Sequence, residues 1–182
     1  MNDRTQLSDE EIVGIIRTKD KELYVELIKR YEAKLLRYAS YILGDVHAGA
    51  DAVQEAFIKA YINLNGFDTH KKFSSWIYRI VHNEAMNILN KRKRQRPIDE
   101  RIDMDSGVNL EDEYIKRELI GNAHNCLEQM PLLYKVPLAL FYLENKSYKE
   151  IGDILRIPIG TVGTRVNRAK IIMKKICQNK KK

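Results

Sequence analysis

The stretch that decides the fold spans residues 147–170 and reads SYKEIGDILRIPIGTVGTRVNRAK. It holds two short helical patterns with only three residues, RIP, between them. Ser147 followed by Glu150 is a capping-box pattern, in which the hydroxyl and the carboxylate each satisfy a backbone N–H at a helix start. Pro158 fits the first turn of a second helix but not a helix interior. The stretch therefore predicts two short helices joined by a tight turn.

The second of these helices has an apolar face and a polar face. Apolar residues recur with helical spacing at Val162, Val166, Ala169 and Met173. The opposite face carries Thr161, Thr164, Arg165 and Arg168. This arrangement is typical of a helix-turn-helix, whose second helix enters the major groove of duplex DNA. Threonine suits phosphates or base edges and arginine suits phosphate or guanine, so either arginine could read a base. A helical hairpin with a merely solvated polar face is the alternative.

Composition indicates a globular helical protein with an anionic partner. The chain has 182 residues, of which 44% are hydrophobic and 31% charged, and its net charge is +7. No apolar run approaches the roughly 18 residues of a membrane span, and the first residues do not resemble a signal peptide. We therefore expect a cytoplasmic protein with no direct membrane insertion. Cys126 and Cys177 lack metal-ligand spacing and are predicted to be ordinary thiols.

Charge divides the chain into three segments. Residues 1–96 carry 17 Lys and Arg against 13 Asp and Glu, and residues 114–182 carry 14 against 5. Between them, residues 97–113 carry 1 against 7 and show no helical stripe. Such an acidic, unpatterned segment is typical of a linker. We therefore expect a first domain (residues 1–96), a linker (97–113) and a second domain (114–182).

Helical periodicity runs through both domains, and no alternating strand pattern interrupts it. Ser8 and Glu11 form a capping box before the first helix. Further helices are expected near 21–43, 48–64, 74–93, 114–130 and 136–144. The predicted fold class is all-α, with two small helical domains.

The first domain mixes aromatic and cationic residues over residues 65–96. Aromatic faces can stack on unpaired bases while cations follow the phosphates, and Asn can hydrogen-bond base edges. The candidate residues for a single-stranded site are Phe67, Lys71, Phe73, Trp76, Arg79 and Asn83. Trp76 as a plain core anchor is the alternative.

A third surface is acidic. In DAVQEAF, Asp51, Gln54 and Glu55 lie at helical spacing away from Val53 and Phe57. Carboxylates repel DNA, so this patch is expected to meet a protein.

Four stretches together resemble the extracytoplasmic-function sigma factors of bacterial RNA polymerase. They are RYEAKLLRYASYILGD, DAVQEAFIKAYINL, FSSWIYRIVHN and the opening stretch, in the family's order. The resemblance covers roughly residues 10–175. It implies a sigma-two helical bundle in the first domain and a sigma-four helix-turn-helix in the second.

The resemblance also implies partners and roles for the candidate residues. Asp51, Gln54 and Glu55 match positions that dock on the clamp helices of the largest subunit of core RNA polymerase. The candidate residues for the single-stranded site match the segment that melts the promoter −10 element. The Thr and Arg face matches the reader of the −35 duplex. No long C-terminal sensory extension follows, so we expect a separate anti-sigma factor, of which a membrane-anchored protein is one form.

Two other functions stay open on the residues alone. A stand-alone helix-turn-helix transcriptional regulator explains the opening stretch but not the acidic patch or the aromatic loop. An enzyme is not favoured, since no phosphate-binding loop, metal spacing or nucleophile with a paired base is evident. We expect a non-catalytic transcription initiation factor without cofactor or metal.

Overall fold

The computed structural model describes residues 7–95 and 129–179, and every regular element in these two ranges is a helix. The predicted all-α fold class is confirmed. The elements are α1 (Asp9–Thr18), η2 (Lys21–Leu23), α2 (Tyr24–Leu43), α3 (Val46–Ile62), η3 (Leu64–Gly66), α4 (Phe73–Gln95), α6 (Leu132–Tyr142), α7 (Tyr148–Leu155) and α8 (Ile159–Asn179). The expected linker 97–113 and nearly all of the helix expected near 114–130 lie outside the described residues.

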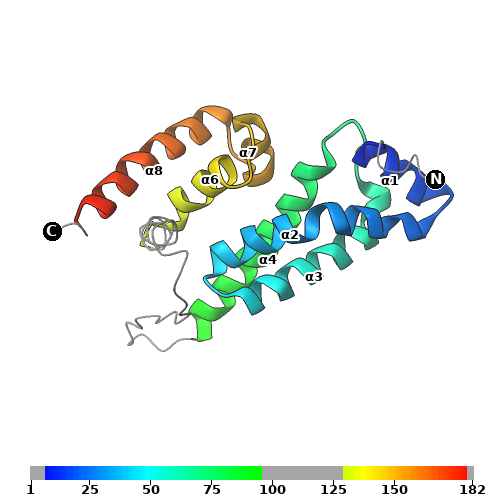
Figure 1. The fold of residues 1–182 in the computed structure, drawn as a ribbon, viewed down its shortest axis with the longest axis horizontal. Helices are drawn as coiled ribbons and strands as arrows, with labels where there is room; N and C mark the ends of the chain where they lie inside the picture. Colours follow the sequence, from blue (N-terminus) through cyan, green and yellow to red (C-terminus); the bar gives the residue numbers. More distant parts are fainter. Residues whose placement is uncertain (1–6, 96–128, 180–182) are drawn as a thin grey trace, which may run out of the picture.

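The described part of the first domain is a bundle of α2, α3 and α4, with α1 across one end (Figure 1). An apolar stripe of α2, formed by Leu27, Tyr31, Leu35, Tyr38 and Ile42, is buried along its whole length. The stripes of α3 and α4 pack against it through residues such as Phe57 and Val81. Tyr61 lies one turn after the buried Phe57 but is 43% exposed at the end of α3.

The turn between α2 and α3 is specified locally. Gly44 ends α2 in the left-handed region with φ of 64°, a conformation that costs glycine little because it has no Cβ. Asp45 then caps α3 by accepting from the N–H groups of His47 and Ala48. Arg92 of α4 also donates to Asp45, at 3.0 Å, so the corner is tied to the third helix of the bundle.

The helix-turn-helix of the second domain forms as the opening stretch predicts. Ser147 and Glu150 make both hydrogen bonds of the capping box at the start of α7. Arg156 ends α7 in the left-handed region with φ of 53°, and Pro158 directly precedes α8. Val162, Val166 and Ala169 of α8 are buried. Pro137 lies inside α6, which begins four residues before the predicted start.

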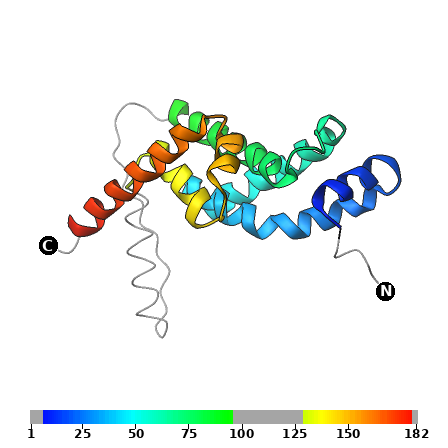
Figure 2. The ribbon, with the colours of Figure 1, turned by 90° about the horizontal axis from the view of Figure 1, so that it is seen from above.

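The two domains are in contact. α7 packs against α4, and α6 lies against α2, so buried residues of both domains form one apolar cluster. Figure 2, which views the molecule from above, shows α7 beside α4 and α8 extending from there to the end marked C. We call this the closed arrangement.

Two sequence-based expectations are tested by the described helices. None of them is long and apolar enough to cross a membrane. Cys177 in α8 is disulfide-bonded, so the prediction of an ordinary thiol is wrong. The one other cysteine of the sequence, Cys126, lies outside the described residues.

Candidate nucleic-acid and polymerase interfaces

An aromatic cluster forms where the loop after α3 meets the first turn of α4. The ring of Trp76 lies 5.0 Å from that of Phe67 and 5.6 Å from that of Phe73, measured between centroids. Phe67 and Phe73 are buried, whereas Trp76 is half-buried. In the closed arrangement the two phenylalanines therefore support Trp76, which keeps part of its surface open. Sequence spacing alone could not tell the buried phenylalanines from the partly open tryptophan.

Helix α1 holds both ends of this loop. Arg17 donates through Nε to the carbonyl of Leu64 at 3.0 Å, and through Nη2 to the carbonyls of Leu64 and Phe67. The N–H of Phe73, at the start of α4, donates to the carboxylate of Glu10 at 2.7 Å. These supporting residues were missed from the sequence, because contacts across 47 or more positions leave no local signal.

The polar candidate residues for the single-stranded site extend from this cluster along α4. Lys71 and Asn83 are exposed, and Arg79 is half-buried. Burial lowers the pKa of Arg79, and the nearby charge of Arg156 lowers it further, although guanidinium groups in proteins stay charged. His82 adds no charge at neutral pH, because burial lowers its pKa to about 4.

The polar face of α8 is a separate surface. Thr164 and Arg168 are exposed, while Thr161 and Arg165 are partly exposed. The four side chains surround a hollow of about 270 Å³ that Leu133 and Tyr134 of α6 complete. Thr164 donates its hydroxyl proton to the carbonyl of Gly160 at 3.0 Å, which leaves the oxygen as an acceptor on this face. The structure thus brings together the four residues that the sequence grouped.

The acidic patch lies on α3, where Asp51, Gln54 and Glu55 are all exposed. Lys59 partly neutralises it, since its ammonium lies 3.3 Å from Glu55 and 2.8 Å from Glu84 of α4. Asp51 therefore carries the least compensated charge of the patch.

An apolar groove beside the patch was missed from the sequence. It has a volume of about 750 Å³, runs between α2 and α3, and includes Gln54 in its lining. Four of its large apolar side chains are exposed: Val25, Ile58, Tyr61 and Ile62. The sequence does hold one signal for this groove. The apolar face of α3 is wider than a buried stripe needs, because Ile58 and Ile62 repeat at i, i+4 beside Val53 and Phe57.

Two carboxylates of the second domain fix the closed arrangement. Glu144, whose side chain is 1% exposed, pairs with Arg37 of α2 at 2.9 Å and accepts a hydrogen bond from Tyr78 of α4 at 2.5 Å. Glu150 pairs with Lys72 at 3.0 Å. Consequently α7 lies against the side of α4 that carries Trp76 and Arg79, while the polar face of α8 stays exposed.

Comparison with known proteins identifies the family of both domains. Residues 27–95 match Sigma-70 region 2, and residues 120–173 match Sigma-70, region 4. The chain is 31% identical over 171 residues to the ECF RNA polymerase sigma factor SigW of Bacillus subtilis, covering 88% of this chain and 91% of that protein. It is 34% identical over 178 residues to the ECF RNA polymerase sigma-E factor of Escherichia coli (strain K12), covering 91% and 92%.

Solved structures agree on the fold. CnrH in complex with the cytosolic domain of CnrY superposes with a TM-score of 0.73 at 18% identity, covering 94% of this chain and 97% of that chain. The sigma factor RpoE in complex with the anti-sigma factor NepR from Bartonella quintana also gives 0.73, at 19% identity and 85% and 96% coverage. A stand-alone helix-turn-helix regulator is not favoured, since it leaves the region 2 match unexplained. The chain therefore belongs to the ECF sigma factors, transcription initiation factors that direct RNA polymerase to promoters.

Proposed function

We propose that this chain is a non-catalytic subunit that joins bacterial core RNA polymerase and carries two promoter-binding surfaces. In this proposal the first domain (1–96) melts and holds the −10 element. The second domain (114–182) binds the −35 element as duplex, and the linker (97–113) spans the distance between them.

The observation that carries the proposal is the separation of two different cationic surfaces on two domains. The loop and first half of α4 combine a half-buried tryptophan with Lys71, Arg79 and Asn83, a combination suited to unpaired bases and their phosphates. The polar face of α8 carries Thr and Arg side chains along one exposed side of a helix, which suits a major groove.

The closed arrangement also bears on when DNA can bind. The surface assigned to the −10 element faces α7 across a cavity, so the second domain has to move away before a single strand can lie along all of it. We propose that docking on core polymerase supplies that separation. Free chain is accordingly expected to bind promoter DNA weakly.

The acidic patch and the adjoining groove are proposed to bind the clamp helices of the polymerase largest subunit. Exposed apolar side chains next to exposed carboxylates suit a protein surface that is both apolar and basic. Charge repulsion makes this surface unsuited to DNA.

We also propose that an anti-sigma factor restrains the chain. One structural neighbour, RpoE, was solved in complex with the anti-sigma factor NepR, and another, CnrH, with the cytosolic domain of CnrY. Binding of an anti-sigma factor and binding of core polymerase are separate proposals, and each can be tested with purified protein.

The first prediction concerns the double variant Asp51→Arg/Glu55→Arg, compared with the parent in gel shifts on promoter DNA with and without core enzyme. The parent should form a promoter complex only when core enzyme is added. The variant should lose that complex by tenfold or more, because it reverses two exposed charges at the proposed docking surface.

Glu22→Arg provides a matched control, since Glu22 is an exposed carboxylate of the same domain that lies outside the patch and the groove. It should behave like the parent. Tight, specific binding of free chain to duplex promoter, or a double variant with unchanged core binding, would contradict the proposal.

A further inference from the structure

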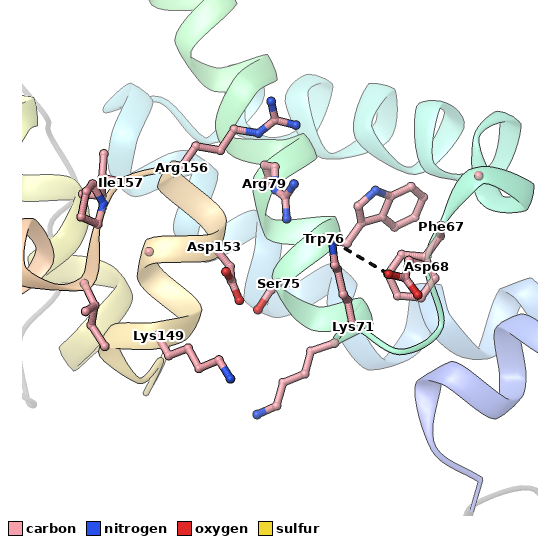
Figure 3. Close-up of a pocket in the computed structure, with 15 residues that line it drawn as sticks. Phe67, Asp68, Lys71, Ser75, Trp76, Arg79, Lys149, Asp153, Arg156 and Ile157 are labelled. Carbon is pink, nitrogen blue, oxygen red and sulfur yellow. Dashed lines mark ion pairs between the residues drawn. The ribbon is translucent and has the colours of Figure 1, made fainter.

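A cavity between α4 and α7 has more cations than carboxylates in its lining. It has a volume of about 780 Å³ and takes residues from both domains (Figure 3). Its charged side chains are five cations and two carboxylates, an excess of three positive charges: Lys71, Lys72, Arg79, Lys149, Arg156, Asp68 and Asp153. Like charges held together around a cavity repel one another unless an anion lies among them.

The ion pairs at the cavity involve Lys71 and Lys72, and the carboxylate of Asp153 opposes only part of the charge around Arg79. Lys71 lies 3.9 Å from Asp68, and Lys72 pairs with Glu150 at 3.0 Å. Arg79 and Arg156 form no ion pair with any residue in the described parts of the chain. In Figure 3 the side chain of Arg156 extends from the end of α7 toward α4, the helix that carries Arg79.

Two buried polar atoms at the cavity also lack partners. Ser75 is 4% exposed, and its hydroxyl has no hydrogen-bond partner among residues 7–95 and 129–179. The Nε of Arg79 is in the same situation. Buried donors in native proteins nearly always have partners, so an unsatisfied pair on one wall indicates a missing acceptor. Figure 3 shows Ser75 turned from α4 toward α7, across the cavity.

We propose that the closed chain binds a small anion of the diphosphate class in this cavity, either free or as part of a nucleotide. Guanidinium groups bind phosphate oxygens in pairs of parallel hydrogen bonds, and Ser75 supplies a further donor. A volume of about 780 Å³ is in the range of small-molecule sites and holds a nucleotide, with Trp76 at its edge. Because Arg79 and Arg156 belong to different domains, a bound anion holds the closed arrangement together.

The test is calorimetric titration of the full chain with sodium pyrophosphate, at an ionic strength matched with sodium chloride. Arg79→Gln and Arg156→Gly should each weaken pyrophosphate binding by tenfold or more. Arg156→Gly is the sharper variant, because glycine tolerates the left-handed backbone at this position and should leave the fold at least as stable. Lys174→Gln, at an exposed cation on α8 away from the cavity, should bind within twofold of the parent.

Parallel titrations with ATP and with a 5′-phosphorylated single-stranded hexamer distinguish the sources of the anion. Pyrophosphate or ATP binding that requires both arginines supports the site. Binding of the hexamer alone would overturn it, and so would pyrophosphate binding that survives Arg156→Gly or that vanishes at matched ionic strength. The assay contains no polymerase, so a chain that binds no pyrophosphate could still have the proposed promoter function. Equally, a chain that fails the promoter test could still bind pyrophosphate.

Discussion

Gly14 and Gly49 both lie inside helices of the first domain, but only Gly49 is required to be a glycine. A Cβ added to Gly49 would lie 2.4 Å from Oγ and 2.8 Å from the backbone nitrogen of Ser40, where α3 crosses α2. A Cβ added to Gly14 in α1 would meet nothing within 4 Å. The same substitution should therefore have opposite effects at the two positions.

Gly49→Ala should lower the free energy of unfolding by about 1–3 kcal/mol, because the helices must separate to admit the methyl group. Gly14→Ala should raise it by about 0.5–1 kcal/mol, because alanine favours the helix and restricts the unfolded chain. Urea unfolding followed by circular dichroism measures both. Higher stability in both variants would show that the close approach at Ser40 is not rigid, and lower stability in both would contradict the expectation for Gly14.

At the scale of the element, α7 is a helix of eight residues that depends on its cap. Burial alone would raise the pKa of Glu150. Hydrogen bonds from the hydroxyl and N–H of Ser147, and then from Lys72, outweigh burial and lower that pKa to about 2. The stabilisation from this carboxylate is therefore complete above its ordinary pKa of 4.5 and is lost as the pH falls from there toward 2.

Ser147→Ala should raise the pKa of Glu150 toward its ordinary value and cost about 1 kcal/mol of stability at neutral pH. An NMR titration of the Glu150 carboxyl group follows the first effect directly. Ser8→Ala removes the equivalent cap of α1 and should leave the Glu150 titration unchanged. An unmoved Glu150 pKa in Ser147→Ala would assign the shift to Lys72 instead.

The helices themselves were largely predictable, and their ends were less so. Period and local capping identified seven of the segments that the structure describes as helical, including both capping boxes. The observed helix boundaries differ from the predicted ones in two places. One is the short 3-10 turn that Asp20 caps before α2, and the other is α6, which contains Pro137. On α8, the four candidate residues lie on one face of one helix, so spacing alone could place them side by side.

The first-domain site was harder to predict, because several segments build it. Spacing could place Trp76 beside Phe73 but could not show that Phe67 and Phe73 are buried beneath it. The groove on α2 and α3 and the cavity between α4 and α7 depend on contacts between distant segments. Such contacts leave no periodic signal in one sequence.

At the scale of the whole molecule, Glu144 is the main electrostatic link between the domains. Its nearly fully buried carboxylate is held by Arg37 and Tyr78 of the first domain, and the ammonium of Lys146 lies 4.4 Å from the Tyr78 ring centroid. Removing one partner of a buried, hydrogen-bonded ion pair is costly, because the other groups stay desolvated.

Glu144→Gln should therefore open the closed arrangement without unfolding either domain. Small-angle X-ray scattering of the free chain should report a larger radius of gyration than the parent, with unchanged helical content. Glu22→Gln alters an exposed carboxylate far from the domain contact and serves as the control. A compact Glu144→Gln variant would show that apolar contacts of α6 and α7 suffice to hold the domains.

The attachment of the aromatic loop to α1 has a practical consequence for work on this protein. Arg17 and Glu10 secure the loop from the amino-terminal helix, tens of positions earlier in the chain. Trimming that helix, or fusing a bulky tag against it, should therefore lower the base selectivity of the proposed −10 site while leaving binding to core polymerase intact. An affinity handle is better placed elsewhere when start-site choice is being measured.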